Sequence, residues 1–218
     1  MSALRKPKMT GARDADVIAL LHRYQCPTPF HEVRTRFLGN IASPVMAASP
    51  VETVKQLWGG ELPEFDSLES VNELLNVLVA GLWNRLTAHQ SSRNPFRLLH
   101  FEVAQKREDL KNLALVRRQE LDGFVEGLFG REEIMNLPER AHTALGVLAE
   151  IRAMLAGIVD LLDDPNKSAE PDDLRDLVHN IQKLSVILET EMNKAVLSCA
   201  RARRQLLEQM PATKPTLQ

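Results

Sequence analysis

The sequence has 218 residues, of which 44% are hydrophobic, 26% charged and 5% aromatic, and its formal net charge is -2 at pH 7. A chain of this length can bury a hydrophobic core without disulfides or metals. Its near-neutral charge argues against a dedicated nucleic-acid binder, and its few aromatic residues favour packing of helix on helix over a sheet architecture.

The number of cysteines and the hydropathy of the sequence indicate a cytoplasmic location. Cys26 and Cys199 are the only cysteines, too few for a disulfide framework. The longest apolar stretch, residues 74–83, is far shorter than a membrane span. No apolar segment follows the basic start, as it would in a signal peptide. We therefore expect a cytoplasmic protein with reduced thiols and no membrane contact.

The two ends of the sequence are predicted to be disordered tails. Residues 1–12 are basic and contain a proline and a glycine, and residues 211–218 are polar with a proline. The first helix should follow the first tail, beginning near Asp14 and ending near Tyr24. Residues 13–210, between the two tails, are therefore predicted to be folded.

A second helix is predicted to begin after a Pro-x-Pro turn. Thr28 is expected to cap it through its side chain, with Pro29 at the first helical position. Gly39 is expected to end it, because glycine is the usual residue just beyond a helix C-terminus.

Ser49 gives a fuller start signal, since Pro50 follows at the first helical position and Glu52 can complete a capping box. Gly59 and Gly60 should end this short helix. A new amphipathic helix is then predicted from Asp66 or Ser67 to about residue 86, closed by residues 91–95. The loop between the two helices should be pinned to the core by Trp58, Leu62 and Phe65.

Residues 99–129 are predicted to form one helix, which Gly130 ends. Its apolar residues keep the spacing of a single buried face, with Leu115 and Val116 outside that face. We therefore expect this helix either to touch two neighbours or to be kinked.

Residues 131–210 are predicted to form a helical hairpin with a coiled-coil-like seam, because apolar residues alternate spacings of three and four. The first arm carries the seam residues Ala141, Ala144, Leu148, Ile151, Leu155, Ile158 and Leu162. The second carries Leu174, Val178, Ile181, Ser185, Leu188, Met192, Ala195, Cys199, Ala202 and Leu206. The second arm is longer by roughly ten residues, an overhang of about 15 Å. It should rest on the N-terminal part, meet a partner or project into solvent.

Few residues suggest chemistry. His22, Cys26 and His31 have the donor atoms for zinc, although a fourth ligand is not evident. A buried cysteine beside two partly exposed histidines is the favoured interpretation. The Glu-x-x-His pair Glu139/His142 and the pair Asp176/His179 have helical ligand spacing, but about 30 Å of hairpin should separate them.

The sequence contains no Walker loop, Rossmann fingerprint or Cys-x-x-Cys motif, and no nucleophile elbow. No catalytic residue and no cofactor are therefore assigned. Arg201, Arg203 and Arg204 form a cationic cluster that complements a helix C-terminus. Binding of an acidic protein surface or of nucleic acid is the alternative use of that cluster.

One resemblance covers roughly residues 28–130. The segment 49–96 resembles the YecA/YgfB-like family of bacterial all-helical proteins. The matching residues are Leu57-Trp58-Gly59-Gly60, Pro63-x-Phe65 and Asn94-Pro95-Phe96, with a further likeness in Gly123-Phe124-Val125-Glu126-Gly127. Arg36 stands where the family usually has glycine, and the cysteine-rich zinc module of some members has no counterpart here. The resemblance implies a helical, dimeric bacterial protein that acts through protein contacts.

We therefore expect an all-α protein with a helical domain at residues 13–130 and the hairpin at 131–210. The leading hypothesis is a non-enzymatic protein–protein interaction or regulatory protein. Its contact surfaces would be the overhang near Arg201–Leu207 and the exposed side of the hairpin, with a homodimer through the hairpin. The alternatives are a metal-binding protein or metal-dependent enzyme, and a nucleic-acid-associated regulator.

Overall fold

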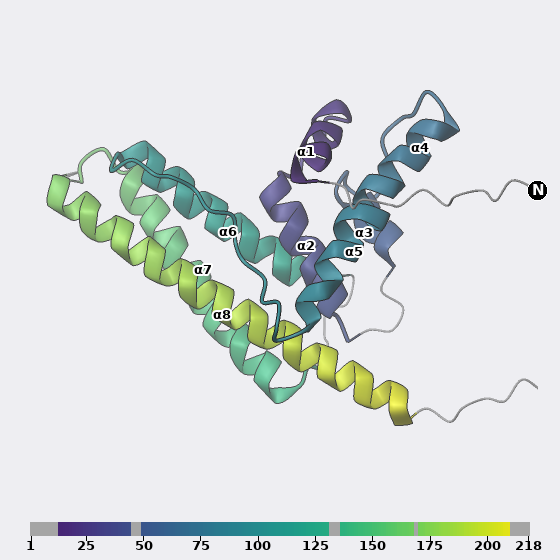
Figure 1. Ribbon diagram of the computed structural model, residues 1–218. Coiled ribbons are helices and arrows are strands. Elements are labelled where there is room, and N and C mark those ends of the chain that lie inside the picture. Colours follow the sequence, from purple (N-terminus) through teal and green to yellow (C-terminus); the bar gives the residue numbers. More distant parts are fainter. Residues whose placement is uncertain (1–12, 45–48, 131–135, 168–169, 210–218) are drawn as a thin grey trace, which may run out of the picture.

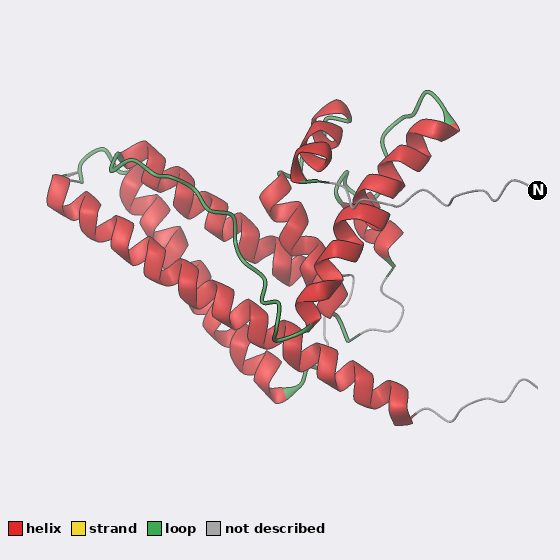
Figure 2. Ribbon diagram, viewed as in Figure 1, coloured by secondary structure: helices red, strands yellow, loops and turns green. Residues whose placement is uncertain are grey.

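The computed structural model describes residues 13–44, 49–130, 136–167 and 170–209. The predicted tails 1–12 and 211–218 lie outside these ranges. Helices make up the secondary structure of the described residues, and none of these residues forms a strand (Figure 2). The all-α prediction is confirmed.

The helices follow one another with short connections, except before α6. Their bounds are α1 (Asp14–Arg23), α2 (Phe30–Ala42), α3 (Pro50–Gln56), α4 (Leu68–Leu75), η1 (Asn76–Trp83), α5 (Asn84–Leu86), η2 (Thr87–Gln90), α6 (Arg107–Phe129), α7 (Glu139–Asp163) and α8 (Pro171–Gln209). The stretch from α4 to η2 is helical throughout, with a π-helical part in η1 and a 3₁₀ turn in η2. It corresponds to the predicted amphipathic helix of residues 66–86.

The fold is centred on a close crossing of α2 and α6, made by glycines on both helices. A Cβ atom on Gly39, Gly123 or Gly127 would lie less than 3.0 Å from main-chain atoms of the other helix. Gly39 therefore sits inside α2, which continues to Ala42. The prediction that Gly39 ends the helix is wrong, because the absent side chain serves packing and not a left-handed turn.

Helices α6, α7 and α8 pack side by side as an elongated bundle, and α1 to α5 gather at one end of it (Figure 1). The hairpin of α7 and α8 is confirmed. Because α6 contacts α2 as well as the hairpin, it has the two sets of neighbours that Leu115 and Val116 indicated. The buried apolar side chains form one continuous cluster, from Val17 in α1 to Cys199 in α8.

An extended strap (residues 95–106) occupies the start of the region predicted to be helical, and α6 begins only at Arg107. The strap runs back along α6 and α8 (Figure 1). The side-chain amide of Asn193 in α8 pairs with both backbone groups of one strap residue, as the backbone of a neighbouring β-strand would. The Phe96 N–H donates to Asn193 Oδ1 at 2.8 Å, and Asn193 Nδ2 donates to the Phe96 carbonyl at 3.0 Å.

Charged side chains satisfy the next peptide groups of the strap. Glu189 Oε1 accepts from the Leu98 N–H at 3.0 Å, and Arg117 Nη2 donates to the Leu99 carbonyl at 2.8 Å. The prediction of a helix from residue 99 is therefore wrong. Backbone groups there are paired with side chains of other elements and not with their own segment.

Arg107 ties the start of α6 to the end of α7. Its Nε donates to the Leu162 carbonyl at 2.6 Å, and its Nη2 donates to the Leu161 carbonyl at 3.2 Å and also to Asp164. The last carbonyls of a helix have no partner within the helix and carry partial negative charge. The guanidinium therefore caps α7 from outside.

The loop after α3 is pinned as predicted. Ser49 caps α3 by accepting from the Glu52 N–H, and Ser67 caps α4 by accepting from the Ser70 N–H at 3.2 Å. Asp66 thus precedes the cap. Trp58 Nε1 donates to the Tyr24 carbonyl at 2.9 Å, and the Phe65 ring contacts the Tyr24 ring edge-on.

Gly59 and Gly60 both have positive φ, at 81° and 113°, so they turn the chain out of α3 as the sequence indicated. Thr28 departs from its predicted role. Its hydroxyl donates to the Leu57 carbonyl at 3.0 Å, and Pro29 takes the cap position of α2 without a side-chain bond.

Candidate functional site

The C-terminal part of α8 is one of the surfaces that the packing leaves incompletely covered. α8 has 39 residues and α7 has 25, so α8 extends past the bundle (Figure 1). Cys199 and Ala200 are buried, at a level where α8 also contacts α2 and η2. The overhang therefore first rests on the N-terminal helices and then projects. We call residues 201–209 the α8 end.

Arg203 anchors this helix to the N-terminal helices. Its Nη1 donates to the Ser43 carbonyl at 3.2 Å, and its Nη2 donates to Gln90 Oε1 at 2.6 Å. Burial lowers the pKa of its guanidinium. The predicted cluster of three arginines is therefore divided, because Arg203 is bonded to other elements of the fold whereas Arg201 and Arg204 are exposed.

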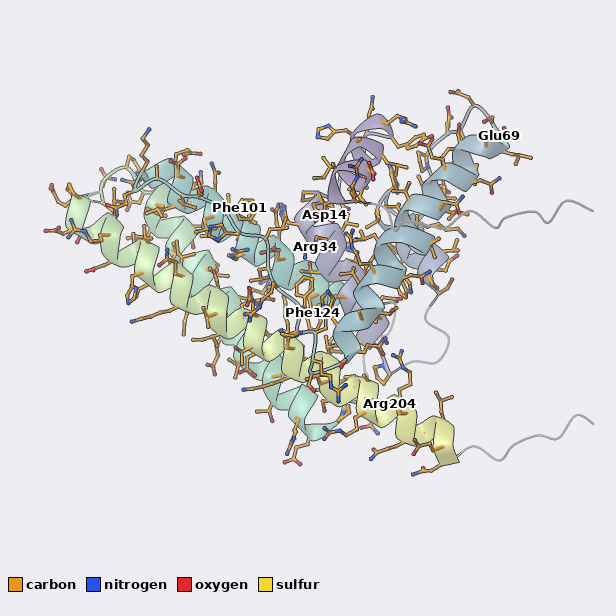
Figure 3. The ribbon with its side chains drawn as sticks, viewed as in Figure 1. Asp14, Arg34, Glu69, Phe101, Phe124 and Arg204 are labelled. Atoms are coloured by element: carbon orange, nitrogen blue, oxygen red, sulfur yellow. The ribbon has the colours of Figure 1, made fainter. Side chains whose placement is uncertain are left out.

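Arg201 and Arg204 are exposed, and neither forms an ion pair with another described residue. Among the described residues, Arg204 Nε donates to the Ala200 carbonyl of its own helix, at 3.4 Å. Figure 3 shows Arg204 on the projecting part of α8. Leu206 and Leu207 follow with 51% and 49% of their surface exposed. The prediction that Leu206 continues the buried seam is wrong, because the bundle ends before it.

The α8 end thus combines two free cations with two half-exposed leucines on a helix that is fixed at its base. A rigid apolar helix face flanked by arginine is typical of helix-in-groove and helix-on-helix contacts. It carries no nucleophile and no acid–base pair. Its chemistry is that of binding.

The three zinc candidates do not converge. His22 is exposed, Cys26 Sγ donates to the Leu57 carbonyl at 3.6 Å, and His31 Nε2 lies 2.8 Å from Gln119 Oε1. Among the described residues, no group of three or more His, Cys, Asp or Glu side chains could hold a metal ion. Glu139, His142, Asp176 and His179 are exposed and belong to no such group either.

His22 and Cys26 instead line a pocket of about 320 Å³ at the corner between α1 and α2. Gln25, also in its wall, has a φ of 47° and closes the end of α1 in the left-handed conformation usual for that position. Burial raises the pKa of the Cys26 thiol, which disfavours its thiolate form.

The remaining cysteine lies in the core. Cys199 is fully buried, and burial raises the pKa of its thiol to about 11. The nearby Arg203 opposes this shift without reversing it. The thiol is therefore a core group, as its place on the seam indicated.

One buried charge pair lies beneath the strap. Arg117 Nη1 donates to Glu120 Oε2 at 2.5 Å, and Glu120 is fully buried. Arg117 Nε also donates to Ser185 Oγ at 3.0 Å. Burial raises the pKa of the Glu120 carboxyl, and Arg117 works against that rise. With its donors and acceptors used on α8 and the strap, the pair has a structural role.

Sequence reasoning identified the α8 end through its length but missed the residues that position it. The sequence does not distinguish Arg203 from Arg201 and Arg204, because the partners of Arg203, Ser43 and Gln90, lie far away along the chain. Arg107 was missed altogether. It lies inside the helix predicted for residues 99–129, and its partners lie more than fifty residues away along the chain.

Comparison with known proteins adds no identity. No protein-family model matches the sequence, and neither a curated protein nor a solved structure matches it. None of the helices in the described part of the chain has the length and hydrophobicity needed to cross a bilayer. The resemblance to the YecA/YgfB-like family stays a prediction.

Proposed function

We propose that this protein is a non-enzymatic protein–protein interaction or regulatory protein of the bacterial cytoplasm, and that the α8 end is its main contact surface. The observation that carries the proposal is the pairing of Leu206 and Leu207, each about half exposed, with the free cations Arg201 and Arg204 on one anchored helix end. Leucines flanked by unpaired arginine suit a partner surface that is apolar at its centre and acidic at its rim.

The rest of the molecule supports a binding role over a catalytic one. The half-buried His31 and the buried Arg117 and Glu120 have partners within the fold, and the pKa values of both cysteine thiols are raised by burial. These groups are committed to structure. Binding through a preformed helix end needs none of them.

A paired-variant capture experiment tests the proposal. Tagged wild-type protein and the double variant Leu206→Ser/Leu207→Ser are used to capture partners from native lysate, with identification by mass spectrometry. Both leucines are about half exposed, so the variant should lose little more than about 0.5 kcal/mol of stability. The double variant should lose a partner that the wild type captures.

Val186→Ser is the matched control. Val186 lies on the same helix with 64% of its surface exposed, but away from the α8 end. This variant should keep the partner. Retention of the partner by Leu206→Ser/Leu207→Ser would contradict the proposed surface, and turnover in a broad hydrolase and transferase screen would contradict the non-enzymatic assignment.

In the nucleic-acid alternative, the same two arginines bind phosphate groups. The salt dependence of the affinity distinguishes this alternative from protein binding. Neutralising phosphates with lysine and arginine makes affinity fall steeply as salt rises. A variant with Arg201→Ala and Arg204→Ala that binds nucleic acid as well as the wild type would exclude this alternative. Elemental analysis of the purified protein tests the metal-binding alternative.

A further inference from the structure

Charge is strongly segregated between two distant parts of this chain. No lysine or arginine occurs between Lys55 and Arg85, whereas five acidic residues do. All five are exposed and lie around the start of α4: Glu61, Glu64, Asp66, Glu69 and Glu73. Glu73 pairs with Arg23 at 2.8 Å, and the other four form no ion pair with a described residue. We call residues 61–73 the acidic tip.

Leu68 projects from the centre of the acidic tip. It is the first residue of α4, and 77% of its surface is exposed, more than for any other large hydrophobic residue described. The side chain of Ser67 caps α4 directly before it, so the leucine stands on a fixed helical turn. The acidic tip thus presents an exposed leucine surrounded by carboxylates. It is complementary to the α8 end, which presents leucines beside arginines.

The α8 end has the opposite charge over a similar length. No acidic residue occurs between Glu191 and Glu208. The cations in that interval include the free Arg201 and Arg204 beside the exposed Leu206 and Leu207. The two surfaces therefore match in both respects, since each presents exposed leucine with charge of one predominant sign near it; Glu208, beside Leu207, is the one carboxylate of the α8 end.

Within one molecule these surfaces do not meet. Figure 3 shows Glu69 at the tip of α4 and Arg204 on the projecting part of α8, well apart in this view. Any contact between them must join two molecules.

We propose that the α8 end of one copy binds the acidic tip of a second copy. Leu206 and Leu207 would pack against Leu68, and Arg201 and Arg204 would pair with carboxylates of the tip. This inference rests on the proposed function, because it names a second copy of the chain as the partner of the same surface. The two surfaces differ, so the contact is heterologous and each added copy presents both again. The products are rings or open rows.

The strength and salt dependence of this contact follow from its composition. Two helix ends bury less area than a standard interface, so association is expected at about 10–100 µM protein. The ion pairs lie at an exposed rim, where salt screens them. Assembly should therefore weaken as the salt concentration rises. A homodimer through the exposed side of the hairpin would differ, because its single symmetric contact stops growth at two copies.

Complementary charge-reversal variants test the proposal by sedimentation velocity at low salt. One variant carries Arg201→Glu and Arg204→Glu, and the other carries Glu64→Lys and Glu69→Lys. Each alone should stay monomeric while the wild type forms dimers and larger species. An equimolar mixture should again form dimers and larger species, because two contacts are then matched: the two native surfaces pair with each other, and so do the two reversed ones. A chain with all four substitutions should assemble like the wild type.

The control is Glu150→Lys/Asp160→Lys, which reverses two exposed carboxylates of α7 and should leave assembly unchanged. A wild type that stays monomeric at the highest concentration would overturn the proposal, and so would assembly that neither charge-reversal pair affects. Loss of assembly in the α7 control alone would assign self-association to the hairpin. If the wild type is monomeric but loses a lysate partner on Leu206→Ser/Leu207→Ser, the proposed function stands and the copy-to-copy contact fails.

Discussion

Glycines allow α2 and α6 to approach closely, whereas another glycine of this protein lies on an open helix surface with no such role. Gly127 faces the Arg36 carbonyl, and a Cβ there would overlap it. Gly157 on α7 has no atom within 4 Å of the corresponding position. The first glycine is required by packing, and the second only weakens its helix.

Gly127→Ala should therefore destabilise the protein by about 1–3 kcal/mol, because the methyl group forces two helix backbones apart. Gly157→Ala should stabilise it by about 0.5–1 kcal/mol, since alanine is the better helix former at an open site. Urea unfolding followed by circular dichroism measures both. Equal effects of the two substitutions would contradict the close crossing, and a loss of stability in Gly157→Ala would mean that α7 is covered in solution.

His31 should make stability depend on pH. Burial lowers the pKa of its imidazole from the ordinary value of 6.5, and the bond to Gln119 only partly opposes this. The folded state thus prefers the neutral ring, so its contribution is complete above pH 6.5 and is lost as the pH falls through the lowered pKa. His31→Gln should flatten the fall in the free energy of unfolding between pH 7 and pH 5. An unchanged slope in urea titrations would contradict this assignment.

Among the elements, the strap depends most on contacts that are distant in sequence. Asn193→Ala leaves both the N–H and the carbonyl of Phe96 without their partner, and Phe96 is fully buried. We expect a loss of about 1–3 kcal/mol, the cost of an unsatisfied buried polar group. Thr190→Ala is the control, because the exposed Thr190 hydroxyl bonds only to its own helix. Equal stability of the two variants in urea would contradict a stabilising role for the bonds between Asn193 and Phe96.

An element can be predicted from the sequence when the residues that stabilise it lie close together along the chain. Ser49 and Ser67 were found because a cap and the turn it serves are three residues apart. The extended strap was not found, since the Asn193 that pairs with Phe96 lies 97 residues away. Gly39 has the same explanation, because its neighbour Phe124 belongs to another helix. The α8 end was located through its length, but only the fold shows which of its arginines is free.

At the scale of the whole molecule, the shared position of α6 links the N-terminal helices to the hairpin. Side chains from α2, α7 and α8 meet α6 within one buried cluster, and Arg203 adds a bond from α8 to Ser43. A division of the chain at residue 130 would separate α6 from α7, which pack along each other. We therefore expect one cooperative unfolding transition.

Two reporters at opposite ends of the sequence test this cooperativity. Trp58 and Trp83 are the only tryptophans, so fluorescence follows the N-terminal helices. Cys199 reports on α8, because its fully buried thiol, with a pKa of about 11, reacts with a thiol reagent only after α8 separates from the core. In a Cys26→Ser background, fluorescence and labelling of Cys199 should give the same midpoint in urea. Labelling at lower urea would mean that α8 detaches first and that the hairpin folds as a separate unit, and the α8 end would then lose the fixed base on which its proposed contacts depend.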